Sequence, residues 1–87
     1  MSFTGMDIAG VRQLATLLGQ KADEIDQIKA TLTSQLGSTQ WVGADRERFA
    51  GDWSGQYSAA LTNVSNALRD AMNTANRNAQ EQETASS

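Results

Sequence analysis

Very few residues of this chain have side chains suited to nucleophilic catalysis. The 87 residues include no histidine and no cysteine. Ser54 and Ser65 therefore have no histidine to take the hydroxyl proton, which is how a serine nucleophile is usually activated. Nothing in the sequence favours an acyl-transfer or thiol-based enzyme.

The acidic residues do not form a convincing catalytic or metal site either. Segment 45–52 holds three carboxylates, but two arginines alternate with them, as is typical of the solvated first turns of a helix. Segment 23–26 holds three more, without the glycine-containing loop that a calcium site needs. We therefore predict a protein that is not an enzyme and that needs no cofactor and no metal.

Composition narrows the class of partner. The formal net charge is −3, so phosphate backbones would be repelled and nucleic acid is not expected as a ligand. There is no long apolar run that would span a bilayer, and the polar helix faces are not basic enough for binding on a membrane surface. Arg12 and Gln13 interrupt the stretch where a secretory signal would need apolar residues, so we expect no cleaved signal.

Two long helices are predicted by an apolar period of about 3.6 residues on either side of a short loop. The first helix is expected over about 7–36, with Thr4 or Asp7 as its N-cap and Gly37 at its C-terminal cap. A loop over 37–44 follows. Asp45 is expected to cap a second helix over about 45–79. The chain contains no proline, which permits helices of this length.

The fold class predicted is an all-α antiparallel helix-turn-helix hairpin, covering 1–79, with a flexible polar tail over 80–87. The apolar positions that we expect to form its core and dimer seam recur at intervals of three, four and seven: Val11, Leu14, Leu18, Ile25, Ile28, Leu32, Tyr57, Leu61, Val64 and Leu68. Gly51 and Gly55 interrupt the second helix, either where another backbone comes close or as tolerated surface glycines.

The apolar stripes are wider than one neighbouring helix needs, because flanking positions join the seam. With 13 alanines among its apolar residues, a lone hairpin this small would bury little area. This indicates that two hairpins pair into a four-helix bundle. Lys21 and Gln35 fall on the seam, where they either specify the register and partner or extend to the edge.

The loop residues Trp41-Val42-Gly43, followed by Phe49 and Trp53, resemble the WXG family of small bacterial proteins of about one hundred residues. The resemblance covers nearly the whole chain, including both helical halves and the central tripeptide. It implies a hairpin that forms homo- or heterodimers and leaves the cell folded, without a cleaved signal peptide, through the type VII (ESX) secretion system and its membrane ATPase. Trp41 then either closes the end of the hairpin or presents a recognition surface.

One departure from the family pattern bears on the partner. Ala75 and Ala79 occupy the positions where many members carry a Tyr-X-X-X-Asp/Glu export motif. We therefore expect a heterodimer with a related hairpin that supplies the signal, in preference to a homodimer. The alternative is a structural or adaptor hairpin of another bacterial assembly, not secreted by type VII. Type III needle proteins are similar in outline, but their turn is built on proline.

Overall fold

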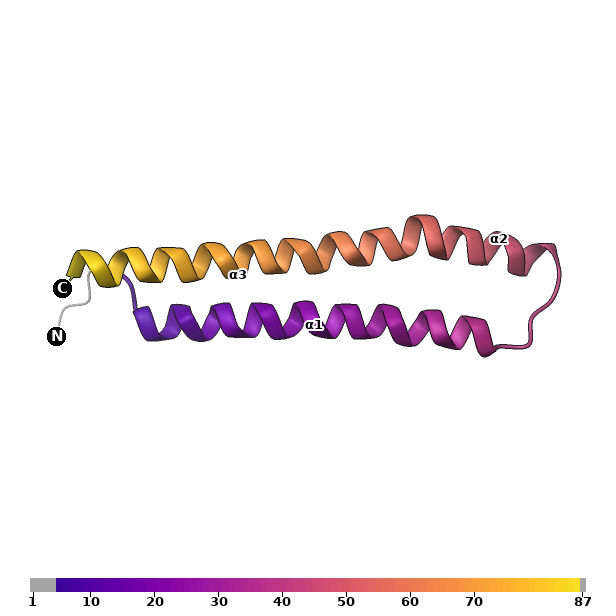
Figure 1. The fold of residues 1–87 in the computed structure, drawn as a ribbon, viewed down its shortest axis with the longest axis horizontal. Helices are drawn as coiled ribbons and strands as arrows, with labels where there is room; N and C mark the ends of the chain where they lie inside the picture. The colour runs from indigo at the N-terminus through magenta and orange to yellow at the C-terminus, as the bar shows by residue number, and fades with distance from the viewer. Residues whose placement is uncertain (1–4, 87) are drawn as a thin grey trace.

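The computed structural model describes residues 5–86 and has two long antiparallel arms (Figure 1). The first arm is helix α1 (Ile8–Ser38). The second consists of α2 (Ala44–Asp52), a π-helical turn η1 (Trp53–Tyr57) and α3 (Ser58–Ser86), which follow one another without a break. The hairpin measures 65 × 18 × 17 Å, so it is only one layer of two helices thick. The predicted all-α hairpin is confirmed.

The start of α1 agrees with the sequence analysis, but its end does not. The Asp7 side chain accepts a hydrogen bond from the Gly10 amide and caps the helix, whereas Thr4 lies outside the described residues. Gly37 lies inside the helix, and the C-cap is Thr39, with φ −80°. The prediction of a glycine cap at 37 is therefore wrong, because the helix continues past Gly37 to Ser38 in ordinary helical geometry.

The second arm begins one residue earlier than predicted. Gly43, with φ +127°, is the N-cap of α2, so the prediction that Asp45 caps this helix is wrong. Asp45 instead lies in the first turn together with Glu47, where carboxylates favour the positive end of the helix dipole. A positive φ at residue 43 strongly favours glycine, which explains why the third residue of the Trp-Val-Gly loop has no side chain.

Residues 80–86, predicted to belong to a flexible tail, are helical because α3 runs through Ser86, and Ser87 lies outside the described residues. Ala79 itself is fully buried. Beyond it, the Glu83 carboxylate accepts a hydrogen bond from the Arg12 guanidinium at 2.9 Å, which attaches this end of α3 to the start of α1. The predicted helix end at 79 is thus wrong by seven residues.

The contact between the arms is centred on small side chains. Within the described part of the chain, the fully buried residues are Ala15, Ala22, Ala79 and Ser65. Close to the middle, a Cβ on Gly19 would lie 2.7 Å from the Met72 sulfur, so the arms approach closely there. The larger predicted seam residues lie beside this alanine line, and the arms consequently bury few bulky side chains completely.

The π-helical turn changes the phase of the second arm. A π-turn holds an extra residue compared with an α-turn, so α3 is rotated relative to α2 by about one residue. Gly51 lies near the end of α2 and Gly55 lies within this turn, and a Cβ added to either would meet nothing within 4 Å. Within the hairpin they are therefore surface glycines and mark no close approach of the other arm.

Candidate functional site

Large apolar side chains remain close to half exposed along both arms. On α1 these are Leu14, Leu17, Ile28 and Leu32, and on the second arm they are Phe49, Tyr57 and Val64. A monomeric surface normally scatters such residues singly, and a contiguous set marks a binding site. Their arrangement therefore decides whether they form a single surface.

Helical geometry places these residues on one side of the hairpin. Leu14 directly precedes the buried Ala15, and Val64 directly precedes the buried Ser65, so each lies about 100° from the buried line of its own helix in the same rotational sense. Because the two helices are antiparallel, equal offsets of this kind point to the same side. We call this surface the apolar face: Leu14, Leu17, Lys21, Ile28, Leu32, Gln35, Tyr57 and Val64.

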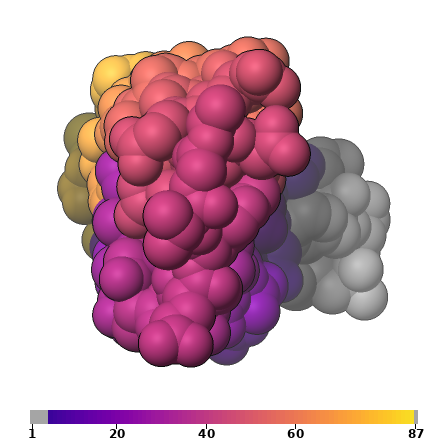
Figure 2. Space-filling view, turned by 90° about the vertical axis from the view of Figure 1, so that its right-hand side faces the viewer, coloured from indigo at the N-terminus to yellow at the C-terminus, as the bar shows by residue number. Residues whose placement is uncertain are grey.

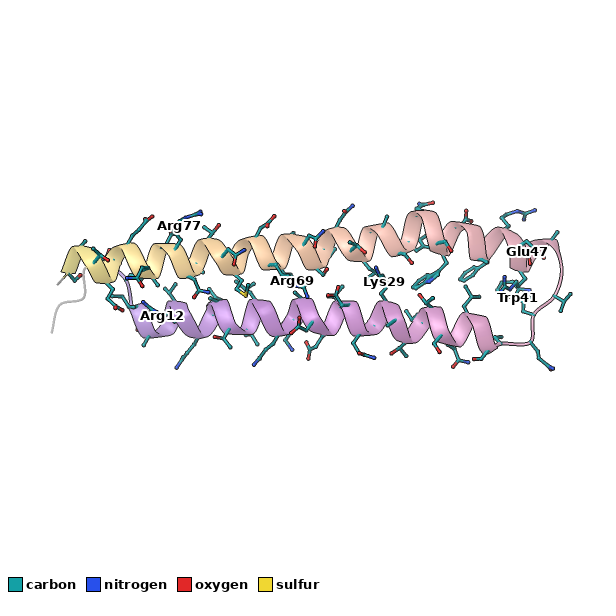
Figure 3. The ribbon with its side chains drawn as sticks, viewed as in Figure 1. Arg12, Lys29, Trp41, Glu47, Arg69 and Arg77 are labelled. Carbon is teal, nitrogen blue, oxygen red and sulfur yellow. The ribbon has the colours of Figure 1, made fainter. Side chains whose placement is uncertain are left out.

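At the loop end the apolar face deepens into a groove of about 340 Å³, lined by Leu32, Gln35, Leu36, Thr39, Trp41, Phe49 and Trp53. The Trp41 and Phe49 ring centroids are 5.4 Å apart, within the range of favourable tilted aromatic pairs. Figure 3 shows Trp41 lying between the loop and the second arm. Figure 2, which views the molecule from the loop end, shows that the loop and α2 form the end of the hairpin.

The groove is held in shape by a hydrogen bond between the arms. The Trp53 indole nitrogen donates to the Thr33 hydroxyl at 2.8 Å. Phe49 and Tyr57 ring centroids are 6.4 Å apart, which links the groove to the rest of the apolar face. The π-helical turn follows Phe49 in the chain and ends at Tyr57, so its extra residue determines how the two rings line up.

The opposite side of the hairpin carries charged pairs that join the arms. Arg69 donates to Asp26 at 2.7 Å and to Asp23 at 2.8 Å, and it lies between the helices in Figure 3. Asp23 directly follows the buried Ala22, whereas Leu14 directly precedes Ala15, so these charges lie on the side away from the apolar face. The two sides thus differ: on the charged side the side chains pair with one another across the arms, and on the apolar face they remain exposed to solvent.

This charged cluster is electrostatically satisfied. The hydrogen bond from Arg69, assisted by one from Ser65, lowers the pKa of Asp26, and the two aspartates raise the pKa of Arg69. Lys29 donates to the Thr62 hydroxyl at 2.7 Å in the same seam. The arrangement stabilises the ionised forms of Asp26 and Arg69.

Two polar residues interrupt the apolar face, and both were placed on the seam by the sequence. Lys21 directly precedes Ala22 and pairs with Glu24 of its own helix at 3.0 Å. Gln35 lies at the edge of the loop groove, where its amide donates to the Thr39 hydroxyl at 3.4 Å. Both polar interactions are made within α1 and its C-cap, and neither reaches the second arm. If Lys21 or Gln35 fixes a helix register, it is therefore the register with a partner and not the register between the two arms.

The predicted seam residues divide into two groups. Those half-buried along the contact between the arms are Val11, Leu18, Ile25, Leu61 and Leu68, and those on the exposed side are Leu14, Ile28, Leu32, Tyr57 and Val64. The centre of the contact is formed by Ala15, Ala22 and Ser65, which were not among the predicted seam residues. For the two alanines the signal was present in their seven-residue spacing, but their small size gave them little weight beside the leucines.

Within residues 5–86 there is no group of three potential metal-binding side chains, and no helix combines the length and apolar character needed to cross a membrane. A scan of protein-family models and searches of curated proteins and of solved structures find no match to this chain.

Proposed function

We propose that this protein functions by pairing its apolar face with another helical hairpin to form a four-helix bundle. The observation that carries the proposal is the single-sided exposure of large apolar residues on a hairpin one layer thick. Covering these side chains, each now close to half exposed, would be favourable by about 25 cal/mol for every Å² of apolar surface removed from water. A second hairpin laid on this side supplies the layer that would cover them.

We further propose that this is a bacterial protein and that a type VII secretion system exports the paired hairpins in their folded state. The support is the resemblance of the Trp41-Val42-Gly43 loop, with Phe49 and Trp53 after it, to the WXG family. The loop groove adds a physical reason for interest in these residues, because three of the aromatic side chains gather there. In this account the secretion ATPase is the second partner, and the related hairpin or a second copy is the first.

Pairing is tested by removing apolar surface from the face without touching the contact between the arms. The double variant Ile28→Ser, Leu32→Ser changes two side chains of the apolar face. Val42→Ser is the matched control, because Val42 is 97% exposed and lies in the loop beyond the face. The proposal expects the double variant to lose pairing and the control to keep it. Equal behaviour of the two variants would refute the role of the face.

Export is tested separately, in a bacterium that has a type VII system, by comparing the chain's abundance in the medium with and without an active ATPase. The proposal expects release to depend on the ATPase. The competing function, a structural or adaptor subunit of another assembly, expects a chain that pairs in the same way but stays with the cells in both strains.

A further inference from the structure

The π-helical turn decides which residues of the second arm face α1. Counted back from the buried Ser65, an uninterrupted α-helix would place Ser54 and Gly51 within about 40° of the buried line. The extra residue of η1 turns the preceding segment by about 100°, so Trp53 and Ala50 are half-buried there instead. This part of the chain therefore has two possible contact sides, one made of small residues and one around Trp53.

Gly37 lies on the contact side of α1 but has no close neighbour there. It is 18 residues from Gly19, which is five full turns, so both glycines lie on the same side of the helix. Gly19 is closely packed, since a Cβ there would lie 2.7 Å from the Met72 sulfur, whereas a Cβ on Gly37 would meet nothing within 4 Å. In the observed register, the packing of the arms therefore gives no reason for a glycine at this position.

Gly37 would meet Ser54 if the second arm were an uninterrupted α-helix. Across the main contact, Lys29 donates to the Thr62 hydroxyl at 2.7 Å. Gly37 is eight residues further along α1, and Ser54 is eight residues back along the second arm, so antiparallel helices bring them to the same level. A glycine facing a serine permits the close approach that the buried alanines make elsewhere in the hairpin. Both registers therefore offer a packed contact between the arms.

The observed register is stabilised by aromatic contacts that the other register lacks. Trp53 donates to Thr33 at 2.8 Å, and the Phe49 and Trp41 ring centroids are 5.4 Å apart. Without the extra residue, Phe49 and Trp53 would be turned by about 100° out of the space between the arms, with Trp53 moving toward the side of Tyr57. The loop groove would then lose the wall that Phe49 and Trp53 form.

We propose that the second arm has two registers and that η1 is the switch between them. In the observed register the extra residue lies in η1 and the loop groove is formed. In the other register Trp53–Tyr57 is ordinary α-helix, the connection 39–43 lets α2 turn by about 100°, Gly37 meets Ser54 and the groove is absent. A molecule that binds in the groove holds the observed register, because a ligand shifts an equilibrium toward the state that it binds. This switch goes beyond the pairing function proposed above and does not depend on it.

The test follows the indole of Trp53 by ¹⁹F nuclear magnetic resonance after labelling with 5-fluorotryptophan. Trp41 and Trp53 are the two tryptophans of the chain, and Trp41→Phe assigns their signals. Trp53 should show a major and a minor state, detected as separate signals or by relaxation dispersion, in a ratio independent of protein concentration. Thr33→Val removes the hydroxyl that accepts from the indole, and it should raise the ratio of minor to major state by up to about tenfold.

Two further variants should abolish the minor state. Gly37→Leu fills space that is open in the observed register and that Ser54 would occupy in the other. Thr31→Leu is the matched control, because Thr31 is exposed on the side of α1 away from the second arm. Deletion of Ser54 removes the extra residue and leaves Trp53 facing α1 in a continuous α-helix, so the groove should persist with a single Trp53 state.

The switch is overturned if Trp53 has a single state in both the wild type and Thr33→Val. It is also overturned if the minor state survives in Gly37→Leu as it does in Thr31→Leu, because that state would then be local unfolding of α2 and not a second packed register. A minor state that grows with protein concentration would arise from association between chains. That result would overturn the switch and leave the proposed pairing intact.

Discussion

Replacing Trp41 with alanine should lower the stability of the hairpin as well as change its surface. The Trp41 side chain is 39% exposed, so about three fifths of it is covered, mainly in the groove with Phe49. That covered part amounts to roughly 120–150 Å² of largely apolar area, and its loss would cost about 3 kcal/mol. Partial collapse of Phe49 into the vacated space reduces the cost, so we expect about 2–3 kcal/mol.

The assay is thermal unfolding followed by circular dichroism at a fixed protein concentration, since the melting temperature of a pairing protein depends on concentration. A loss of 2–3 kcal/mol in a chain of this size lowers the melting temperature by roughly 10–20 °C. Val42→Ala is the control, because the neighbouring Val42 is 97% exposed and its truncation should leave the melt unchanged. An unchanged melt for Trp41→Ala would refute the view that Trp41 closes the groove, and would leave recognition as its only role.

Other substitutions test the packing and the charges independently. Ala22→Leu should destabilise the hairpin by about 1–3 kcal/mol, because Ala22 is fully buried where the arms meet; a raised melting temperature would contradict this. Gly43→Ala should cost about 1–3 kcal/mol at its φ of +127°, whereas Gly51→Ala, in open space on α2, should stabilise by up to about 1 kcal/mol; chemical denaturation measures both. The pKa of Asp26 is lowered in the folded protein, so its contribution to stability is present above about pH 4 and is lost as pH falls through the folded pKa. Melting temperature should therefore fall less steeply below pH 4 in Arg69→Met than in the wild type, and parallel curves would show that this pair has no effect.

The elements of the fold were predictable because helical periodicity is a local property. A seven-residue recurrence from Val11 to Leu32 defines a helix without reference to the rest of the chain. The ends were less predictable. Whether the helix stops at Gly37 or at Ser38 depends on how the loop closes, and the helical structure after Ala79 is accompanied by a contact between Glu83 and the distant Arg12.

The candidate site was predictable in its members but not in its geometry. The width of the stripe indicated that one helix could not cover it, and half of the predicted seam residues are in fact exposed. Which of these residues are half-buried and which are exposed depends on Ala15 and Ala22. Because the side chains of these two alanines are small, the arms meet along the edge of the apolar stripe where the alanines lie, and the residues on the other edge stay exposed. The π-helical turn, which aligns Phe49 with Tyr57, has no sequence pattern from which we predicted it.

The most direct test of the account is the mass of the wild-type chain in solution beside that of the Ile28→Ser, Leu32→Ser variant. Sedimentation equilibrium across the micromolar range should give a mass above the 9.3 kDa of a single chain for the wild type: twice that mass where the partner is a second copy, and the mass of the mixed pair where a related hairpin is supplied. The variant should approach the single-chain mass while retaining helical structure, because neither residue lies at the buried contact between the arms. A wild type that stays at 9.3 kDa, melts cooperatively, is matched in both respects by the variant and binds no other helical hairpin would contradict the claim that the apolar face is a pairing surface.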